Sequence, residues 1–297
     1  MDYTRESFLV SNARACGLMN LAVSSYHYLP HPTRPEAPLR EALRRHAAVR
    51  RRWGYRRLTV LLRREGFLDN HKRIHRLYRA ESLQVRQRRR RKQRLARGAS
   101  QPPAPVQPNE RWSLDFVHDR LVNGRTLRLL TIVDDYTREC LWIEADTSLS
   151  GPRVTRVLDC LSELRGRPAS LLTDNGPEFA GLALERWSHD RQVQHRFITP
   201  GKPSQNAYIE SFNGKLRDEC LNEHEFLHLG HARDLLESFR DDYNHNRPHS
   251  SLGGLAPAEY AARKIAPGPL GGPLDRNQSL AVPTLNPQPP STLPDSH

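Results

Sequence analysis

The sequence predicts an α/β fold that follows a small helical region, and three observations support this prediction. Between residues 110 and 264, apolar runs with a period of two alternate with apolar runs at helical spacing, in the order βββαβαβα. Residues 39–85 contain short apolar runs at helical spacing. A basic and Pro-rich stretch at residues 86–109 separates the two parts and is typical of a linker. We therefore expect a body with three antiparallel strands followed by crossover strands.

The first 38 residues are weakly patterned. Apolar residues from Ala13 to Val23 are spaced for a short helix. Four prolines between Pro30 and Pro38 predict a linker after that helix. We treat residues 1–38 as a segment of their own.

Residues 39–85 are predicted to form a helical module. One helix begins at Leu39, a turn is expected at Trp53–Arg57, and a second helix runs from Leu58 to Gly66. Asn70 is suited to cap the N-terminus of a third helix that ends near Tyr78. Short helices with arginine-rich faces resemble a helix-turn-helix DNA reader. An ordinary three-helix bundle is the alternative interpretation.

Charge is divided unevenly along the chain. Residues 1–100 contain 25 Lys/Arg and 7 Asp/Glu, a balance of +18. The remaining residues contain the other 21 of the 46 basic and 26 of the 33 acidic side chains, a balance of −5. Eight of the twelve residues from Arg86 to Arg97 are basic. This distribution favours a polyanion as the partner; a solvated basic segment is the alternative.

Composition excludes several classes of protein. No run approaches the roughly 18 apolar residues that span a bilayer, and the N-terminus lacks the layout of a signal peptide. We therefore expect a cytoplasmic protein with no membrane partner. No cysteine lies within four residues of another, so no zinc-ligand pair is visible among Cys16, Cys140, Cys160 and Cys220.

The body covers residues 110–264, and a Pro-rich tail at residues 265–297 is predicted to be disordered. Strands are predicted at residues 112–117, 127–133, 141–145, 170–173 and 193–198. Helices are predicted at residues 154–164, 179–187, 205–221 and 232–243.

Three carboxylates stand out by position. Asp115 lies inside the first predicted strand. Asp174 ends the short apolar strand that begins at Leu171, and Glu210 lies on a long predicted helix. A carboxylate in or beside a buried strand is costly unless it is paired or binds a metal ion. Mg²⁺ takes oxygen ligands, and two such ions can activate a nucleophilic oxygen and stabilise the leaving oxygen of a phosphodiester. We therefore predict that Asp115, Asp174 and Glu210 are both the catalytic residues and the metal ligands.

The spacing and the surrounding residues resemble a known family. There are 58 residues between Asp115 and Asp174 and 35 between Asp174 and Glu210, which resembles the DDE triad of retroviral integrases and related transposases. The chain is similar to the second-reading-frame transposases of the insertion-sequence-three family. The motifs that carry the resemblance are Arg111–Phe116, Asp134–Cys140, Thr173–Phe179 and Pro200–Asn222, with Gly54–Arg57 and Asn70–Tyr78 in the basic region and Tyr243–Asn244 and Arg247–His249 at the end.

The resemblance implies a ribonuclease-H-like integrase catalytic core with an N-terminal helix-turn-helix-like DNA-binding region. It implies two Mg²⁺ or Mn²⁺ ions during catalysis, and cleavage and transfer of DNA strands during transposition. It also implies a bacterial, nucleoid-associated protein that forms a homo-oligomer on DNA and works as a fusion with, or partner of, an upstream-frame product. The DNA-binding residues expected are Arg56, Arg57, Lys72, Arg73 and Arg76 in the module and Lys202, Lys215 and Arg217 near the triad.

Two other functions remain open at this point. One is a catalytically silent DNA-binding relative that inhibits transposition, although all three triad positions are acidic. The other is a ribonuclease-H-type nuclease, which would not need a helical DNA reader or a basic segment. Joining of a supplied DNA end distinguishes these functions, because only a transposase should join DNA.

Overall fold

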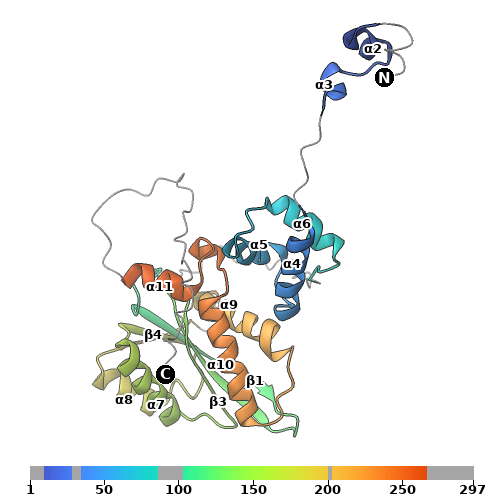
Figure 1. The fold of residues 1–297 in the computed structure, drawn as a ribbon. Helices are drawn as coiled ribbons and strands as arrows, with labels where there is room; N and C mark the ends of the chain where they lie inside the picture. Colours follow the sequence, from blue (N-terminus) through green and yellow to red (C-terminus); the bar gives the residue numbers. More distant parts are fainter. Residues whose placement is uncertain (1–9, 29–34, 86–102, 200–202, 266–297) are drawn as a thin grey trace, which may run out of the picture.

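A computed structural model of the chain describes residues 10–28, 35–85, 103–199 and 203–265 (Figure 1). The basic run at residues 86–97, Lys202 and all but the first residue of the predicted tail lie outside the described residues. In the part of the chain that is described, no helix is long and apolar enough to cross a membrane.

The N-terminal part is helical, as predicted. Two short helices, α2 (Asn12–Leu18) and α3 (Val23–Tyr26), precede a module of three helices, α4 (Ala37–Val49), α5 (Tyr55–Arg64) and α6 (His71–Ala80). The three module helices share a core of their own, with Leu43, Leu58 and Leu77 fully buried. The predicted cap is confirmed, because the Asn70 side chain accepts a hydrogen bond of 2.9 Å from the backbone N–H of Lys72.

Two predicted boundaries in this region are wrong. The turn expected at residues 53–57 ends at Gly54, and Tyr55 begins α5. Tyr55 packs against the same core as Leu58 and Leu62, which lie three and seven residues later on one helix face. The linker expected up to Pro38 also ends earlier, because Pro38 lies in the first turn of α4, where a missing N–H costs nothing.

The body contains a five-stranded sheet whose order is β3-β2-β1-β4-β5. The antiparallel strands β1 (Arg111–Arg120), β2 (Thr126–Asp134) and β3 (Cys140–Asp146) are followed by β4 (Ser170–Thr173) and β5 (Gln194–Phe197), which run parallel to β1. The prediction of three antiparallel strands followed by crossover strands is therefore confirmed, and so is the expected ribonuclease-H-like fold.

Helices cover both faces of this sheet. On one face, α7 (Gly151–Arg165) and α8 (Leu182–Asp190) bury Trp112, Leu114 and other residues of β1 and β2. On the opposite face, α9 (Ala207–Leu216) and α10 (Leu229–His245) pack on alternate residues of the same strands (Figure 1). Because successive side chains of a strand point to opposite faces, Asp115 belongs to the face that α9 covers.

The long helix predicted at residues 205–221 is interrupted. A 3-10 turn (Pro203–Asn206) precedes α9, and a π-helical turn (Arg217–Leu221) follows it. The π turn buries Cys220 and Leu221 while Asp218 and Glu219 face the helical module. α8 begins at Leu182 rather than Phe179, and a last helix, α11 (Pro257–Ile265), was not predicted. All four cysteines are described, and each is a free thiol.

Candidate active site and nucleic-acid interface

Asp115 is half-buried, and both oxygens of its carboxylate accept hydrogen bonds. Its Oδ1 accepts a hydrogen bond from the backbone N–H of Phe116 at 2.8 Å, and its Oδ2 accepts one from Asn213 Nδ2 at 2.8 Å. Burial raises the pKa of Asp115, and the nearby charge of Asp174 adds to this effect. Burial therefore disfavours the charged form of Asp115.

Asn213 holds this carboxylate in place. It lies on α9, three residues after Glu210, and its Oδ1 accepts a hydrogen bond from Thr131 Oγ1 at 3.0 Å. The fully buried Thr131 hydroxyl also lies 3.1 Å from the backbone oxygen of Asp115. These contacts join β1, β2 and α9 at one point, which restricts the orientation of the Asp115 carboxylate.

Asp174 follows β4 directly. The parallel pairing of β4 with β1 brings this strand end beside the first strand, where Trp112 faces Leu171 in register. The Asp174 Oδ1 accepts a hydrogen bond from the backbone N–H of Gly176 at 3.0 Å. A Cβ atom at Gly176 would also lie 3.0 Å from Asp174 Oδ1, so the glycine permits this close approach.

Glu210 lies in the first turn of α9 and is exposed. Partial desolvation by the neighbouring residues nevertheless raises its pKa, and so does the charge of Asp115. Asp115 therefore interacts electrostatically with both of the other two carboxylates. Within the described ranges, no three His, Cys, Asp or Glu side chains form a ready-made metal site. The donor set still suits a hard divalent cation, because every member is a carboxylate.

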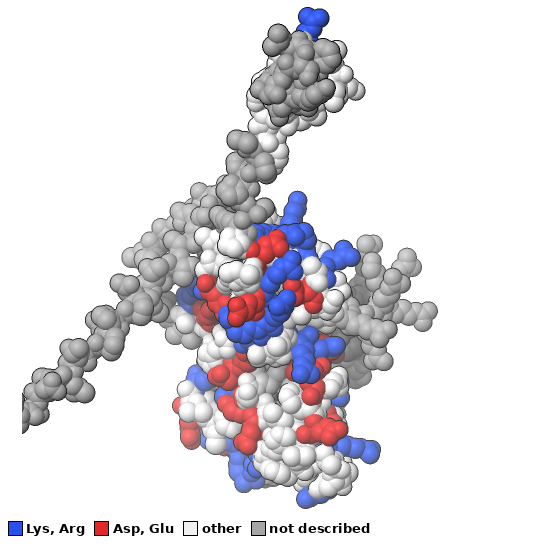
Figure 2. Space-filling model, turned by 45° about the vertical axis from the view of Figure 1, so that its right-hand side comes forward, with Lys and Arg blue, Asp and Glu red and all other residues white. Residues whose placement is uncertain are grey.

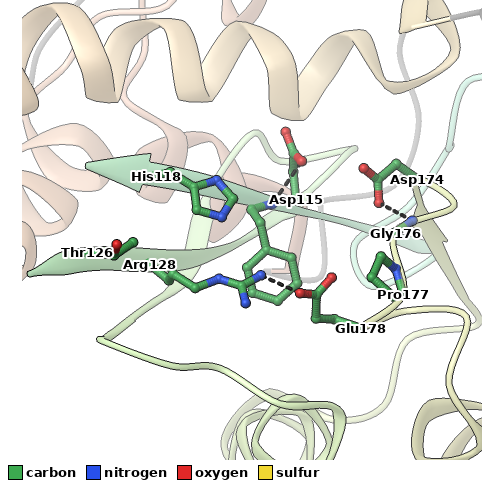
Figure 3. A pocket seen from close by; sticks show the side chains of 9 residues that line it. Asp115, His118, Thr126, Arg128, Asp174, Gly176, Pro177 and Glu178 are labelled. Atoms are coloured by element: carbon green, nitrogen blue, oxygen red, sulfur yellow. Dashed lines mark hydrogen bonds and ion pairs between the residues drawn. The ribbon is translucent and has the colours of Figure 1, made fainter. Parts of the chain in front are cut away.

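An open pocket of about 550 Å³ lies beside Asp115 and Asp174 (Figure 3). Glu210 does not line it. The residues that line it are Asp115, Phe116, His118, Thr126, Arg128, Asp174, Gly176, Pro177 and Glu178. The pocket therefore combines two of the predicted catalytic carboxylates with one arginine.

The predicted DNA-binding residues of the module differ in how available they are. Arg56 and Lys72 are exposed. Arg73 pairs with Asp69 at 3.1 Å, and Arg76 pairs with Glu36. Arg57 is half-buried and pairs with Glu219 of the body at 3.3 Å. Because Arg57, Arg73 and Arg76 are each paired with a carboxylate, they are less available to contact DNA than Arg56 and Lys72.

The predicted DNA-binding residues near Glu210 are also partly engaged. Lys215 is half-buried and donates from Nζ to Ser211 Oγ at 2.9 Å, and desolvation lowers its pKa to about 8. Arg217 is exposed and donates from Nη2 to the backbone oxygen of His118 at 3.1 Å. Arg217 is the first residue of the π turn that follows α9. It contacts a residue of the pocket.

Several basic residues of the module contact acidic residues of the body. Arg50 pairs with Asp242 at 2.5 Å and Arg64 with Glu259 at 2.7 Å. Glu219 accepts hydrogen bonds from Trp53 Nε1 at 3.0 Å and from Arg247 Nε at 3.0 Å. Figure 2 shows Lys/Arg and Asp/Glu side chains interspersed on the face of the molecule that it draws. Part of the basic excess of the N-terminal region therefore neutralises the acidic body.

Comparison with known proteins identifies the family. Residues 105–203 and 191–257 match two integrase core domain families, and residues 35–91 match an HTH-like domain. The chain is 49% identical over 266 residues to the insertion element IS407 uncharacterized 31.7 kDa protein of Burkholderia multivorans, covering 90% of this chain and 96% of that protein. The chain belongs to the insertion-sequence-three family of integrase-core transposases.

Two further matches of this transposase are more distant. It is 29% identical over 228 residues to the putative transposase InsK for insertion sequence element IS150 of Escherichia coli, covering 73% of this chain and 80% of that one. Among solved structures, it is similar to the HTLV-2 integrase catalytic core domain in complex with magnesium, with 16% identity and a TM-score of 0.43, covering 52% of this chain and 98% of that one.

Three residues of the site, Asn213, Arg128 and Glu178, were not among the residues predicted from the sequence. Asn213 could have been found, because its position three residues after Glu210 places it on a neighbouring part of the helix surface. Arg128 and Glu178 are 50 residues apart in the chain, and nothing in the sequence shows that they pair.

Proposed function

We propose that this transposase cleaves DNA strands and transfers them to a new site, with Asp115, Asp174 and Glu210 as the catalytic triad. The proposal rests mainly on one observation. Asp115 on β1 and Asp174, which directly follows the parallel strand β4, line the same pocket, and Glu210 lies on α9 three residues before Asn213, which donates to Asp115. Acidic groups that come from separate elements and lie near one pocket suit phosphoryl transfer with metal ions.

The same three residues would hold two Mg²⁺ or Mn²⁺ ions during catalysis. When bound, these ions would activate the attacking oxygen and stabilise the leaving oxygen of the phosphodiester. The protein's own contribution is orientation. Asn213 and Thr131 restrict the Asp115 carboxylate, and the Gly176 N–H restricts that of Asp174. Fixed orientation of groups around a reacting phosphate lowers the barrier, because the entropy of positioning has already been lost.

DNA is the proposed partner of both parts of the chain. Arg56 and Lys72 are the module residues best placed for phosphate contacts, since both are exposed. Arg217 would contact DNA next to His118 of the pocket. We also propose that the protein forms a homo-oligomer on DNA, cooperates with an upstream-frame product and acts at the nucleoid in the bacterial cytoplasm.

The alternative is a DNA-binding relative that is catalytically silent and inhibits transposition. Both functions predict DNA binding, so the decisive measurement is joining of a supplied element end to target DNA in Mg²⁺. Asp115→Asn, Asp174→Asn and Glu210→Gln should each abolish cleavage and joining while DNA binding is retained, because each replacement keeps the shape and removes a metal-binding charge. Asp190→Asn, at an exposed position of α8, is the matched control.

Near-normal strand transfer by any one of the three variants would remove that residue from the triad. DNA binding without any joining by the wild-type chain, tested with and without the upstream-frame product, would favour the silent relative.

A further inference from the structure

Arg128 lies on β2 and lines the same pocket as Asp115 and Asp174, although its side chain projects from the opposite face of the sheet to that of Asp115. It is in register with His118 of β1, and both residues line the pocket that contains Asp115 and Asp174. Its Nη2 donates to Glu178 Oε1 at 2.5 Å, and its guanidinium lies 5.0 Å from the centre of the Phe116 ring. Figure 3 shows the side chain extending from β2 toward Glu178.

The hydrogen bonding of Arg128 is incomplete. Its Nε–H is buried and has no hydrogen-bond partner in the described structure. A buried donor without a partner costs free energy unless a ligand or an ordered water satisfies it. The guanidinium has five N–H donors in a fixed fork, so it can keep its bond to Glu178 and still offer donors to a second acceptor.

The charges of the pocket indicate what this acceptor is. Asp115, Asp174 and Glu178 all line the pocket, so these carboxylates would repel a phosphate everywhere except beside a positively charged side chain. Of the described lining residues, Arg128 is the one that carries a permanent positive charge. Planar, bidentate hydrogen bonding by arginine suits the oxygens of a phosphate.

We propose that Arg128 binds a phosphate of the DNA strand that occupies this pocket. This inference rests on the proposed function in one respect, namely that DNA is the substrate of the pocket. The phosphate belongs either to the element end or to the target strand, and separate assays distinguish these two sources.

The competing explanation is a purely structural ion pair that fastens β2 to the segment after Asp174. The two explanations predict different results for the two partners. A structural pair is weakened equally by the loss of either residue. A phosphate-binding arginine is needed even when Glu178 is neutral, and Glu178→Gln should leave DNA binding unchanged or improve it, because one negative charge is removed from the pocket.

The experiment compares Arg128→Met, Arg128→Lys and Glu178→Gln in the full chain. Arg128→Met keeps an apolar stem over Phe116 and removes the charge, whereas Arg128→Lys keeps the charge and removes the fork. The pair between Arg153 and Glu144, which is also 2.5 Å long but does not line the pocket, supplies the matched controls Arg153→Met and Glu144→Gln. Thermal unfolding of every variant tests whether it is folded.

Two readouts are used. Cleavage of a donor end without target DNA reports on the element strand, and joining of a precleaved end at varied concentrations of target DNA reports on the target strand. Because a hydrogen bond to a charged group contributes about 1.5–3 kcal/mol, Arg128→Met should weaken one of these reactions about tenfold to a hundredfold. Arg128→Lys should give a smaller loss. The slope of log K against log salt for DNA binding should also fall by about one in Arg128→Met.

Loss of either reaction in Arg128→Met, with activity retained in Glu178→Gln, supports the proposal and identifies the strand. Equal losses in Arg128→Met and Glu178→Gln would show a structural pair and overturn it, and so would normal activity and an unchanged salt slope in Arg128→Met. If Arg128→Met does not fold, full activity of folded Arg128→Lys overturns the requirement for the fork. If the wild-type chain joins no DNA but the salt slope still falls in Arg128→Met, the proposed catalytic function fails while phosphate binding by Arg128 stands.

Discussion

Replacing Glu219 should destabilise the protein more than breaking an exposed ion pair would. The Glu219 side chain is 11% exposed and accepts hydrogen bonds from Trp53, Arg57 and Arg247. Arg247 is the critical partner, because its side chain is 2% exposed and both its Nε and its Nη2 donate to Glu219. Glu219→Gln keeps the volume and one acceptor oxygen but leaves a buried guanidinium without a counter-charge.

The magnitude follows from this burial. Removing one partner of a buried ion pair typically costs about 3–5 kcal/mol, and the lower value is expected here because glutamine retains an acceptor. A loss of about 3 kcal/mol corresponds to a fall in melting temperature of about 6–12 °C for a domain of this size. Thermal and urea unfolding at neutral pH measure both quantities.

The matched control is Glu237→Gln on α10. It breaks the pair between Arg240 and Glu237, in which the glutamate side chain is 61% exposed. Exposed pairs contribute at most about 1 kcal/mol, so this variant should unfold almost like the wild type. A loss in Glu219→Gln no larger than the loss in Glu237→Gln would refute the argument that Glu219 compensates a buried charge.

Three further predictions concern pH, geometry and salt. Burial lowers the pKa of His249 to about 3 from an ordinary value of 6.5, so the unfolded chain binds the proton first and stability falls with falling pH between these values. His249→Asn should reduce this dependence by about 1.4 kcal/mol per pH unit near pH 5, where the unfolded histidine is protonated and the folded one is not; urea unfolding measures this, and an unchanged slope would contradict it. Gly176→Ala should lower cleavage and joining about tenfold with DNA binding intact, because the added methyl group displaces the Asp174 carboxylate; full activity would mean that the loop adjusts. Replacing the eight basic residues from Arg86 to Arg97 by Gln should flatten the slope of log K for DNA binding against log salt by about 0.9 for each DNA phosphate that these residues neutralise, and an unchanged slope would place the electrostatic contacts elsewhere.

Local features of the sequence were sufficient for much of the fold. The strand that contains Asp115 was predictable because its apolar residues alternate, and this alternation depends on neighbours in the chain. The cap at Asn70 was predictable for the same reason, since donor and acceptor are two residues apart. Helix ends were less predictable. The interruption of the helix after Leu216 depends on burial of Cys220 and Leu221 against other elements.

The sequence by itself determined the order of the helices and strands along the chain and the division into a helical module and an α/β body. It also determined the three acidic positions within recognisable motifs. The tertiary structure alone decided what the charges do. It pairs Arg57 with Glu219 and Arg128 with Glu178, residues that are 162 and 50 positions apart. It also places Asn213 on Asp115 across 98 positions. Such contacts depend on sheet register and helix packing, which sum over many residues, so no local pattern in the chain specifies them.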